Sequence, residues 1–275
     1  MNSIKMLALD LDGTLTNSKK EISDKNVEYI HKAQEAGVSI ILASGRPVIG
    51  IKSVADRLNL WKSGGYILAY NGGQIIDCLK GKDLLKKTIP SEFNHDICEI
   101  INRYKVYPLT YNDIGVICEN STDKYVKREA YNNGIDVIKV GSLEREVSEP
   151  VVKFMVVGKP EELNKAYNYL KILFEGKLNV FFSEPYFLEI TPLGIEKASA
   201  LENLSNMLGY TSINMMACGD GLNDIPMLQY AGISVAMENA YEETKKYADF
   251  ISYSNENDGV ALAIDKFIIR GEVSC

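Results

Sequence analysis

Two aspartates, a glycine and a threonine follow an apolar segment near the start of the chain. Asp10 directly follows the segment Met6-Leu7-Ala8-Leu9, and Asp12, Gly13 and Thr14 come after Leu11. A carboxylate that attacks a phosphate dianion meets charge repulsion, so the reaction needs a divalent cation, a second carboxylate for the leaving-group proton, and donors for the phosphate oxygens. This spacing predicts a phosphoryl-transfer site, and an ordinary Asx turn after a strand is the alternative interpretation.

A serine and a glycine follow the next β-branched segment of the chain. Ser44 and Gly45 come after Val38–Ala43 and directly before Arg46-Pro47, where proline is typical of the first turn of a helix. A hydroxyl group and unpaired backbone N–H groups at a helix start bind phosphate oxygens. The segment predicts a phosphate-binding turn, with a helix-capping serine as the alternative.

An acidic, glycine-bearing loop follows a strand late in the chain. Asp220, Asn223 and Asp224 lie in Gly-Asp-Gly-Leu-Asn-Asp after the predicted strand Ile213 to Ala217. Oxygen ligands of this kind are those that Mg²⁺ prefers. Loops at the carboxyl ends of parallel strands converge on one crevice, so we expect Asp10, Ser44 and Asp220 to meet there.

One lysine stands where a cation is disfavoured. Lys197 begins a predicted helix that extends from about Glu196 to Leu208, and the helix dipole there favours negative charge. A phosphate bound at this position explains the lysine, whereas a solvated surface side chain is the alternative.

Strands and helices alternate at both ends of the chain, but the middle follows another pattern. The alternation predicts a parallel sheet with right-handed crossovers. In the middle, adjacent strands with short turns predict an antiparallel sheet with helices on one face. The predicted strands at the start are 4–10, 38–43 and 66–70, with helices over 24–36 and from 44; those of the middle are 106–111, 114–119, 151–157, 178–183 and 186–190, with helices over 91–104, 122–131 and after 160.

The expected fold class is therefore α/β, a Rossmann-like parallel-sheet core with an inserted α+β domain. Residues 1–86 and 191–275 form the discontinuous core, and residues 87–190 form the insertion. Pro90 and Pro192 stand near the two crossing points, where proline suits a turn beside a hinge.

Composition and charge exclude several classes of function. The 275 residues are 46% hydrophobic and carry a formal charge of -7, which disfavours a nucleic-acid-binding surface. No apolar segment is long enough for a membrane span, and we predict a cytoplasmic protein that does not bind membranes. The five cysteines are scattered without a Cys-x-x-Cys pair, which predicts reduced thiols rather than disulfides or a zinc site.

The four motifs together resemble those of a known family. Asp-x-Asp-Gly-Thr, Ser-Gly-Arg, a lysine and Gly-Asp-Gly-x-Asn-Asp occur in the order of the haloacid dehalogenase superfamily. The insertion, with Ala-Tyr-Asn-Gly-Gly at 69–73 and Leu-Glu-Ile-Thr-Pro at 188–192, resembles that of its Cof-type sugar-phosphate phosphatases. The similarity spans essentially the whole chain. Leu193 and Ala198 stand where relatives often carry lysine and glycine, which bears on the substrate more than on the chemistry.

The resemblance implies a role for each motif residue. Asp10 is implied as the nucleophile and Asp12 as the general acid and base. The implied Mg²⁺ ligands are Asp10, the main-chain carbonyl of Asp12, and Asp220, with Asp224 anchoring that loop or ligating through water. The implied phosphate ligands are the Leu11 amide, Ser44, Gly45, Lys197 and Asn223.

These residues predict a Mg²⁺-dependent hydrolase of small phosphomonoesters, with sugar phosphates as the expected substrates and an aspartyl-phosphate intermediate. Its partner is a small phosphorylated metabolite, and neither the physiological substrate nor the oligomeric state follows from the sequence. A phosphotransferase or phosphomutase on the same core is one alternative. A non-catalytic regulator that binds phosphorylated metabolites is the other.

The inserted domain is expected to act as a cap that sets substrate specificity. Polar tips of turns hydrogen-bond hydroxyl groups, and tyrosine rings pack on sugar faces. An ordinary solvated turn is the alternative for each position. The candidate contacts are Tyr111, Asn112 and Asp113 at the first predicted hairpin turn, and Glu184 and Tyr186 at the second.

Overall fold

A computed structural model describes residues 4–272 and divides the chain into two compact units. The first unit takes in the chain up to Gly45, the segment Ile51–Leu85, and the chain from Glu196 onward. The second unit takes in Arg46–Gly50 and Lys86–Ile195.

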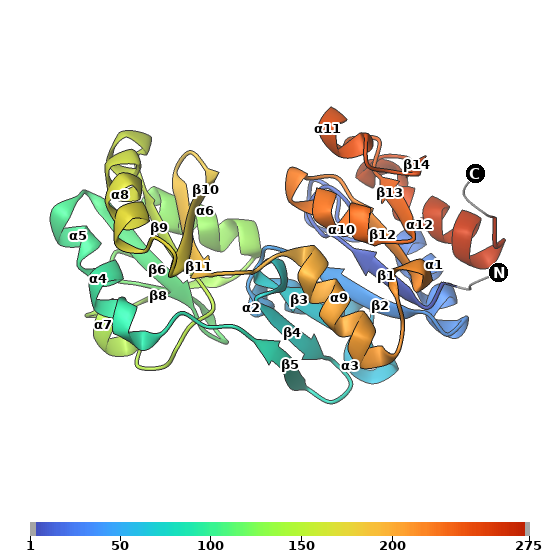
Figure 1. The fold of residues 1–275 in the computed structure, drawn as a ribbon, viewed down its shortest axis with the longest axis horizontal. Coiled ribbons are helices and arrows are strands. Elements are labelled where there is room, and N and C mark those ends of the chain that lie inside the picture. The colour runs from blue at the N-terminus through green and yellow to red at the C-terminus, as the bar shows by residue number, and fades with distance from the viewer. Residues whose placement is uncertain (1–3, 273–275) are drawn as a thin grey trace. The chain divides into compact units, whose positions relative to one another are not determined.

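The first unit is built on an eight-stranded sheet with the order β14-β13-β12-β1-β2-β3-β4-β5 (Figure 1). All neighbours from β14 to β3 run parallel, whereas β4 pairs antiparallel with β3. This confirms the expected α/β class with a parallel-sheet core. The strands are β1 Met6–Leu9, β2 Ser39–Ala43, β3 Tyr66–Ala69, β4 Gln74–Asp77, β5 Lys82–Lys86, β12 Met215–Gly219, β13 Ile233–Ala236 and β14 Phe250–Ile251.

Helices cover this sheet because its strands are apolar on both faces. Met6 and Ala8 of β1 pack with Leu201 of α9 and Leu228 of α10, so the alternate residues of β1 face the other layer. The Ser23 side chain accepts a hydrogen bond from the Asn26 amide and so caps the start of α1. The helices are α1 Asp24–Glu35, α2 Val48–Arg57, α3 Leu60–Ser63, α9 Lys197–Leu208, α10 Ile225–Tyr230, α11 Glu242–Lys245 and α12 Gly259–Ile264; short helical turns are η1 Tyr70–Gly72, η3 Ser212–Asn214, η4 Leu222–Asp224, η5 Asn255–Asn257 and η6 Asp265–Ile269.

The register aligns the carboxyl ends of the central strands. Leu9 of β1 pairs with Leu42 of β2 on one side and with Cys218 of β12 on the other. The loops that follow these three strands therefore leave the sheet at the same edge. In a parallel sheet whose strand order reverses at a central strand, this edge is where ligands bind.

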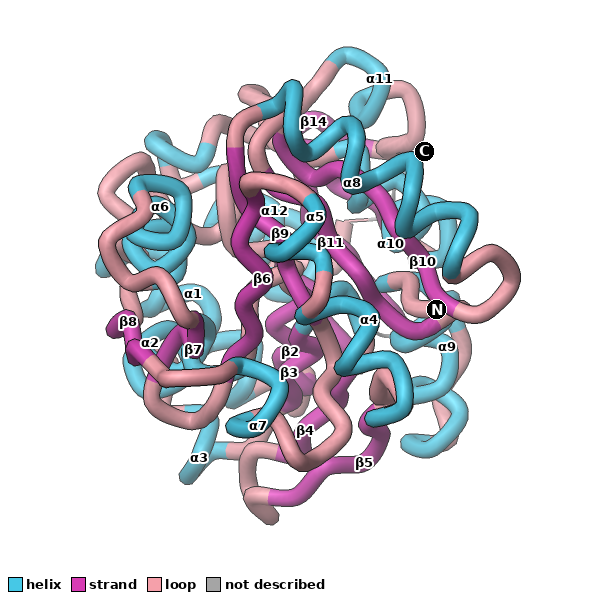
Figure 2. The backbone as a smooth tube through the Cα atoms, turned by 90° about the vertical axis from the view of Figure 1, so that its left-hand side faces the viewer, coloured by secondary structure: helices cyan, strands magenta, loops and turns pink. Residues whose placement is uncertain are grey.

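The second unit contains a six-stranded sheet with the order β10-β11-β9-β6-β7-β8. Figure 2 shows β6, β9, β11 and β10 side by side. The antiparallel pairs β6–β7 and β10–β11 confirm the two predicted hairpins. The strands are β6 Val106–Tyr111, β7 Gly115–Cys118, β8 Asp136–Lys139, β9 Phe154–Gly158, β10 Leu178–Glu184 and β11 Phe187–Pro192, and the helices are η2 Ser91–Phe93, α4 Asn94–Cys98, α5 Ile100–Arg103, α6 Lys124–Asn133, α7 Leu143–Glu146 and α8 Pro160–Leu173.

The expectation of a wholly antiparallel sheet with helices on one face is wrong. β8 pairs parallel with β7, and a parallel neighbour requires a crossover connection, which α6 supplies. Residues of α4, α5 and α8 pack with Val106, whereas Glu129 of α6 contacts Tyr111, which lies on the opposite face of β6. Helices therefore lie on both faces of this sheet.

Four further elements differ from the predicted ones. β4 and β5 were not predicted, and they extend the first sheet beyond β3. The predicted helix 91–104 is divided into η2, α4 and α5, although Asn94 and Glu99 at the junctions keep right-handed helical φ and ψ. The predicted strand at Ile213 begins only at Met215, because Ile213 belongs to η3.

The four described cysteines are buried and form no disulfide: Cys78, Cys98, Cys118 and Cys218. Burial raises the pKa of the Cys218 thiol to about 12, which keeps it protonated. This agrees with the predicted reduced thiols, and Cys275 lies outside the described residues.

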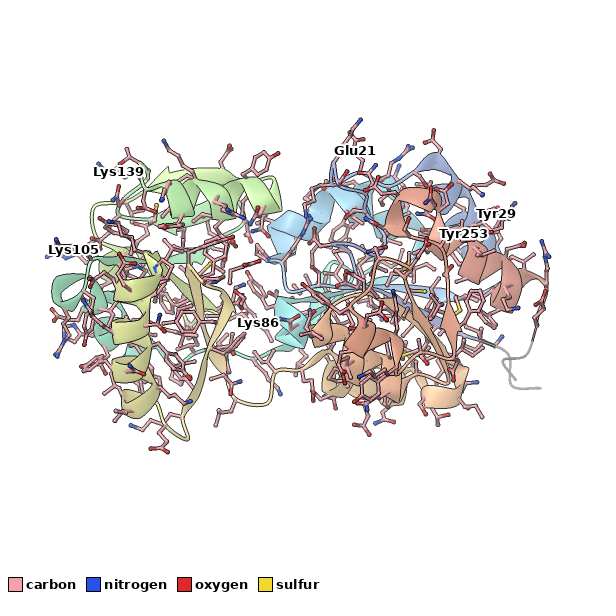
Figure 3. The ribbon with its side chains drawn as sticks, turned by 90° about the horizontal axis from the view of Figure 1, so that it is seen from above. Glu21, Tyr29, Lys86, Lys105, Lys139 and Tyr253 are labelled. Atoms are coloured by element: carbon pink, nitrogen blue, oxygen red, sulfur yellow. The ribbon has the colours of Figure 1, made fainter. Side chains whose placement is uncertain are left out.

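Charged side chains cover the surface of both units. Figure 3 shows Lys105 and Lys139 projecting from the second unit, and both are exposed. Within residues 4–272, none of the helices combines the length and the apolar character that a membrane crossing needs.

Candidate active site

The turn after β1 is closed by its own backbone. The Leu11 carbonyl accepts hydrogen bonds from the Leu15 and Thr16 amides at 3.0 and 2.9 Å. Gly13 has a φ of +84°, and a Cβ atom there would collide with the Asp220 carboxylate. Glycine is therefore required at this position, and it lets Asp220 approach the turn that carries Asp10 and Asp12.

Three aspartates meet beyond the ends of β1 and β12. Asp10, Asp220 and Asp224 each offer one carboxylate oxygen, and these oxygens lie within 4.8 Å of one another. The Lys197 Nζ atom donates to Asp10 Oδ1 and to Asp224 Oδ1, in both cases at 2.6 Å. The Lys197 side chain is 1% exposed. Four residues that are up to 214 positions apart, from Asp10 to Asp224, thus form one cluster, in which Asp220 is half-buried and the other three are buried.

The cluster carries more negative than positive charge. Burial raises the pKa of Asp10 well above its ordinary value, and Asp224 raises it further, whereas Lys197 opposes both effects. Burial also raises the pKa of Asp220 to about 6. Although burial lowers the pKa of Lys197, its contacts with Asp10 and Asp224 raise it above the ordinary value. A single ammonium group thus faces three carboxylates in a buried site, an arrangement that favours binding of a further cation.

The donor set fits a small hard cation. The side chains of the cluster offer carboxylate oxygens as metal ligands, and Mg²⁺ prefers oxygen ligands. The Thr14 hydroxyl donates to Asp220 Oδ1 at 2.7 Å and orients that carboxylate. Asp224 Oδ2 accepts from the Asp220 and Gly221 amides at 3.0 and 2.9 Å. Asp224 thus fastens the loop, and its two carboxylate oxygens are both engaged, one by Lys197 and the other by these amides.

Three of the residues expected to bind phosphate, Ser44, Gly45 and Asn223, contact Asn71. The Ser44 amide donates to the Leu68 carbonyl at 2.9 Å, and the Asn71 amide donates to the Ser44 carbonyl at 2.8 Å. A Cβ atom at Gly45 would lie 3.2 Å from Asn71 Nδ2. Asn223 Nδ2 donates to Asn71 Oδ1 at 3.4 Å. The sequence analysis assigns Asn71 no part in phosphate binding, although Asn71 belongs to the Ala-Tyr-Asn-Gly-Gly segment that supports the resemblance.

The Asp12 carboxylate lies outside the aspartate cluster and forms an ion pair with Lys20. Lys20 has a φ of 64°, in a turn where Asn17 Oδ1 accepts from the Lys19 and Glu21 amides. The contact of Lys20 with Asp12 is a second one that the sequence did not predict. Nothing in the sequence distinguishes Lys20 from the solvated residues beside it.

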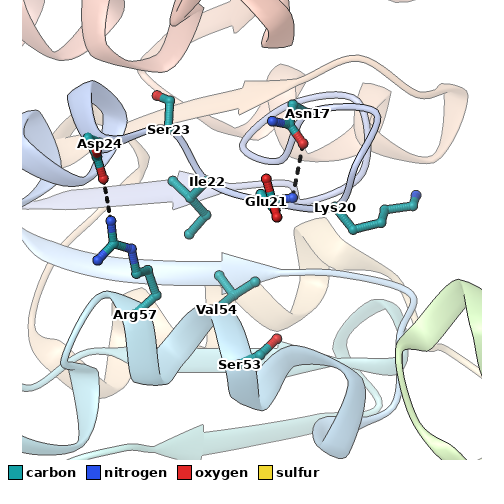
Figure 4. Close-up of a pocket in the computed structure, with 9 residues that line it drawn as sticks. All are labelled: Asn17, Lys20, Glu21, Ile22, Ser23, Asp24, Ser53, Val54 and Arg57. Atoms are coloured by element: carbon teal, nitrogen blue, oxygen red, sulfur yellow. Dashed lines mark hydrogen bonds and ion pairs between the residues drawn. The ribbon is translucent and has the colours of Figure 1, made fainter.

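A cavity of about 510 Å³ lies along the turn that carries Lys20 (Figure 4). An ion pair between Asp24 and Arg57 borders it, and the aspartate cluster does not contribute to its lining. The cavity is therefore distinct from the cluster of Asp10, Asp220 and Asp224.

Three of the five candidate specificity residues make contacts within their own unit. The buried Tyr111 hydroxyl donates to Glu129 Oε1 at 2.6 Å. The Tyr186 ring stacks on Tyr125 with ring centroids 5.4 Å apart. Asn112 Oδ1 accepts from the Ile114 and Gly115 amides, both at 2.9 Å, and so closes the β6–β7 turn. Asn112, Asp113 and Glu184 are exposed at the two hairpin tips.

The chain is similar to known proteins in sequence and in fold. The model of a family described as haloacid dehalogenase-like hydrolase matches residues 7–264. A Bacillus subtilis protein named 5-amino-6-(5-phospho-D-ribitylamino)uracil phosphatase is 32% identical, with 97% of this chain and 96% of that protein covered. The phosphoglycolate phosphatase of Methanobrevibacter smithii is 29% identical, with 97% and 100% covered. The crystal structure of a haloacid dehalogenase-like hydrolase from Bacteroides thetaiotaomicron superposes with a TM-score of 0.94 at 42% identity, with 96% and 100% covered.

Proposed function

Because this chain belongs to the family of haloacid dehalogenase-like hydrolases and is a phosphatase of that family, we propose that it hydrolyses small phosphomonoesters with Mg²⁺, sugar phosphates above all. The observation that carries the proposal is the buried cluster in which Lys197 contacts both Asp10 and Asp224. The proposal assigns Asp10 as the nucleophile and Lys197 to the phosphate, and these contacts support it because both roles require the two side chains to lie together.

The proposed reaction assigns a role to Asp10, to Asp12 and to Lys197. A carboxylate oxygen of Asp10 attacks phosphorus, and the ester oxygen leaves with a proton from Asp12. Asp12 then removes a proton from water, which attacks the aspartyl-phosphate and releases inorganic phosphate. Lys197 balances the charge of Asp10 and of the phosphoryl oxygens, and Mg²⁺ when bound adds further neutralisation of that charge.

A panel of phosphorylated metabolites tests this function. Phosphate release is measured for each compound with Mg²⁺ and after chelation. We expect release from sugar phosphates and its loss with the chelator. Phosphorylated alcohols or isomerised sugar phosphates would instead indicate a phosphotransferase or phosphomutase, and tight binding without release would indicate a regulator.

The acid role of Asp12 predicts a dependence on the leaving group. Asp12→Ala should slow an alkyl phosphate by about 10²–10⁴-fold, and an aryl phosphate much less, because an aryl oxide leaves without a proton. The measurement is single-turnover phosphorylation of the enzyme with both substrates. Asp56→Ala is the matched control, since Asp56 is an exposed aspartate paired with Lys52. Equal slowing of both substrates would exclude the acid role.

Five residues in or beside the two hairpin turns of the second unit are proposed to read the organic part of the substrate. Substitutions of Tyr111, Asn112, Asp113, Glu184 and Tyr186 should change the relative kcat/KM among sugar phosphates, by about 10–200-fold where a contact is lost. Mg²⁺ affinity should stay the same. Asp136→Ala, at an exposed end of β8 in the same unit, is the control and should keep the parent ranking. If all five variants also keep it, these tips do not set specificity.

A further inference from the structure

The turn after β3 adopts a backbone conformation that its residue types rarely take. Tyr70 and Asn71 have φ values of 53° and 55°, so two consecutive residues other than glycine lie in the left-handed region. Gly72 follows with a φ of +96°, and a Cβ atom there would collide with Ala200 of α9. Conformations of this kind persist only where surrounding contacts fix them, and they are frequent at functional sites.

The contacts of Asn71 connect segments that are far apart in the sequence. Its amide donates to the Ser44 carbonyl at 2.8 Å, and its side chain lies against Gly45. Its Oδ1 atom accepts from Asn223 Nδ2 at 3.4 Å. The turn also contacts the first turn of α9, because a Cβ atom at Gly72 would lie 3.0 Å from the Glu196 carbonyl, next to Lys197. Every side chain expected to hold the phosphate is thus on a segment that touches this turn.

The side chain of Asn71 matters chemically as well as sterically. Its carbonyl oxygen occupies one N–H group of Asn223 and so fixes the orientation of that amide. The other N–H group of Asn223 is then directed elsewhere. Asn71 also fills the space beside Gly45, where the hydroxyl-bearing turn of Ser44 begins.

We propose that Asn71 is a positioning residue of the phosphate site, which orients Asn223 toward the phosphoryl group and packs against Gly45. This inference rests on the proposed function. The inference goes beyond the proposed function because it assigns the Tyr-Asn-Gly-Gly turn a part in phosphate binding. The competing explanation is that Asn71 only tolerates the left-handed backbone, as asparagine does more readily than most residues.

Two substitutions separate these explanations. Asn71→Gly relaxes the left-handed backbone but removes the amide, and Asn71→Asp keeps the shape and the acceptor but adds a negative charge. If the side chain positions Asn223, the Kd for inorganic phosphate should rise about tenfold in Asn71→Gly, the effect of one lost hydrogen bond to a charged group. It should rise further in Asn71→Asp, because the new charge repels phosphate.

The experiment is calorimetric titration of the full-length protein with inorganic phosphate at saturating Mg²⁺, together with kcat and KM for one substrate. Asn59→Gly is the matched control, because Asn59 has φ 57° and ψ 28° at the start of α3 and its side chain makes no cap hydrogen bond. We expect the control to bind phosphate as the parent does. In an Asn223→Ala background, Asn71→Gly should add little further loss, since Asn71 acts through Asn223.

Each outcome decides one of the two claims. Parent-like phosphate affinity in Asn71→Gly, or full additivity with Asn223→Ala, would overturn the positioning role while the proposed function stands. A parent protein that binds no phosphate with Mg²⁺ present would overturn the proposed function and this inference with it.

Discussion

Asp10→Asn is expected to reduce turnover by about 10⁴-fold or more, because it removes the nucleophile and leaves only the binding contributions to catalysis. The substitution keeps the size of the side chain and an oxygen that accepts from Lys197 Nζ, which lies 2.6 Å from Asp10 Oδ1. The fold should be preserved. Because burial and Asp224 raise the pKa of Asp10, a charged group at this position is disfavoured, and a neutral amide should leave the thermal midpoint equal or higher.

The measurement combines phosphate release with detection of the acyl-phosphate. Rapid quenching followed by peptide mass spectrometry should find phosphorylated Asp10 in the parent and none in the variant. Asp77→Asn is the control: Asp77 is also buried, lies in β4 and pairs with Lys80 outside the cluster. Near-parent turnover in Asp10→Asn would rule out covalent catalysis at this residue.

The parallel centre of the first sheet was predictable from two things. Its strands are recognisable as apolar segments, and loops that follow parallel strands meet at one edge of the sheet. The segments of β1, β2 and β12 are almost completely buried in the sheet and are therefore apolar. Each can be recognised as a strand from its own residues, without knowledge of the strands beside it. Parallel pairing then places whatever follows them at one edge. The pairing of Leu9 with Leu42 and Cys218 is the register that this rule requires, and it brings the loops of Asp10, Ser44 and Asp220 together.

Contacts that depend on distant residues could not be predicted. The role of Asn71 follows from Ser44 and from Asn223, which is 152 residues away, and no local pattern indicates that Tyr70 and Asn71 adopt positive φ. The ion pair of Lys20 with Asp12 likewise depends on the conformation of a turn, which directs the Lys20 side chain toward Asp12. The sequence does not distinguish this lysine from other exposed lysines. β8 is short and has exposed ends, so its alternation is too weak to indicate a strand or its parallel partner.

Lys197 and Asp220 should affect Mg²⁺ binding in opposite directions. Asp220→Asn removes a proposed ligand, and Mg²⁺ affinity should fall by more than about 100-fold, since even outer-shell partners are typically worth about 10–100-fold. Lys197→Met removes the cation that lies 2.6 Å from both Asp10 Oδ1 and Asp224 Oδ1. Without phosphate, the more negative cluster should then bind Mg²⁺ more tightly than in the parent. Its kcat/KM should nevertheless fall by about 10²–10³-fold, because charge on the phosphoryl group is no longer balanced.

Stability gives an independent measure of the same charge balance. Lys197 is the ammonium group that compensates the buried aspartates, so Lys197→Met in a chelator should lose about 3–5 kcal/mol of unfolding free energy. Added Mg²⁺ should restore much of that loss, because an ion that binds only the folded state stabilises it. Thermal unfolding and Mg²⁺ titration of the parent and both variants measure these effects. If Lys197→Met binds Mg²⁺ as weakly as Asp220→Asn does, the lysine is part of the cation site itself rather than its competitor, and the assignment of Lys197 to phosphate fails.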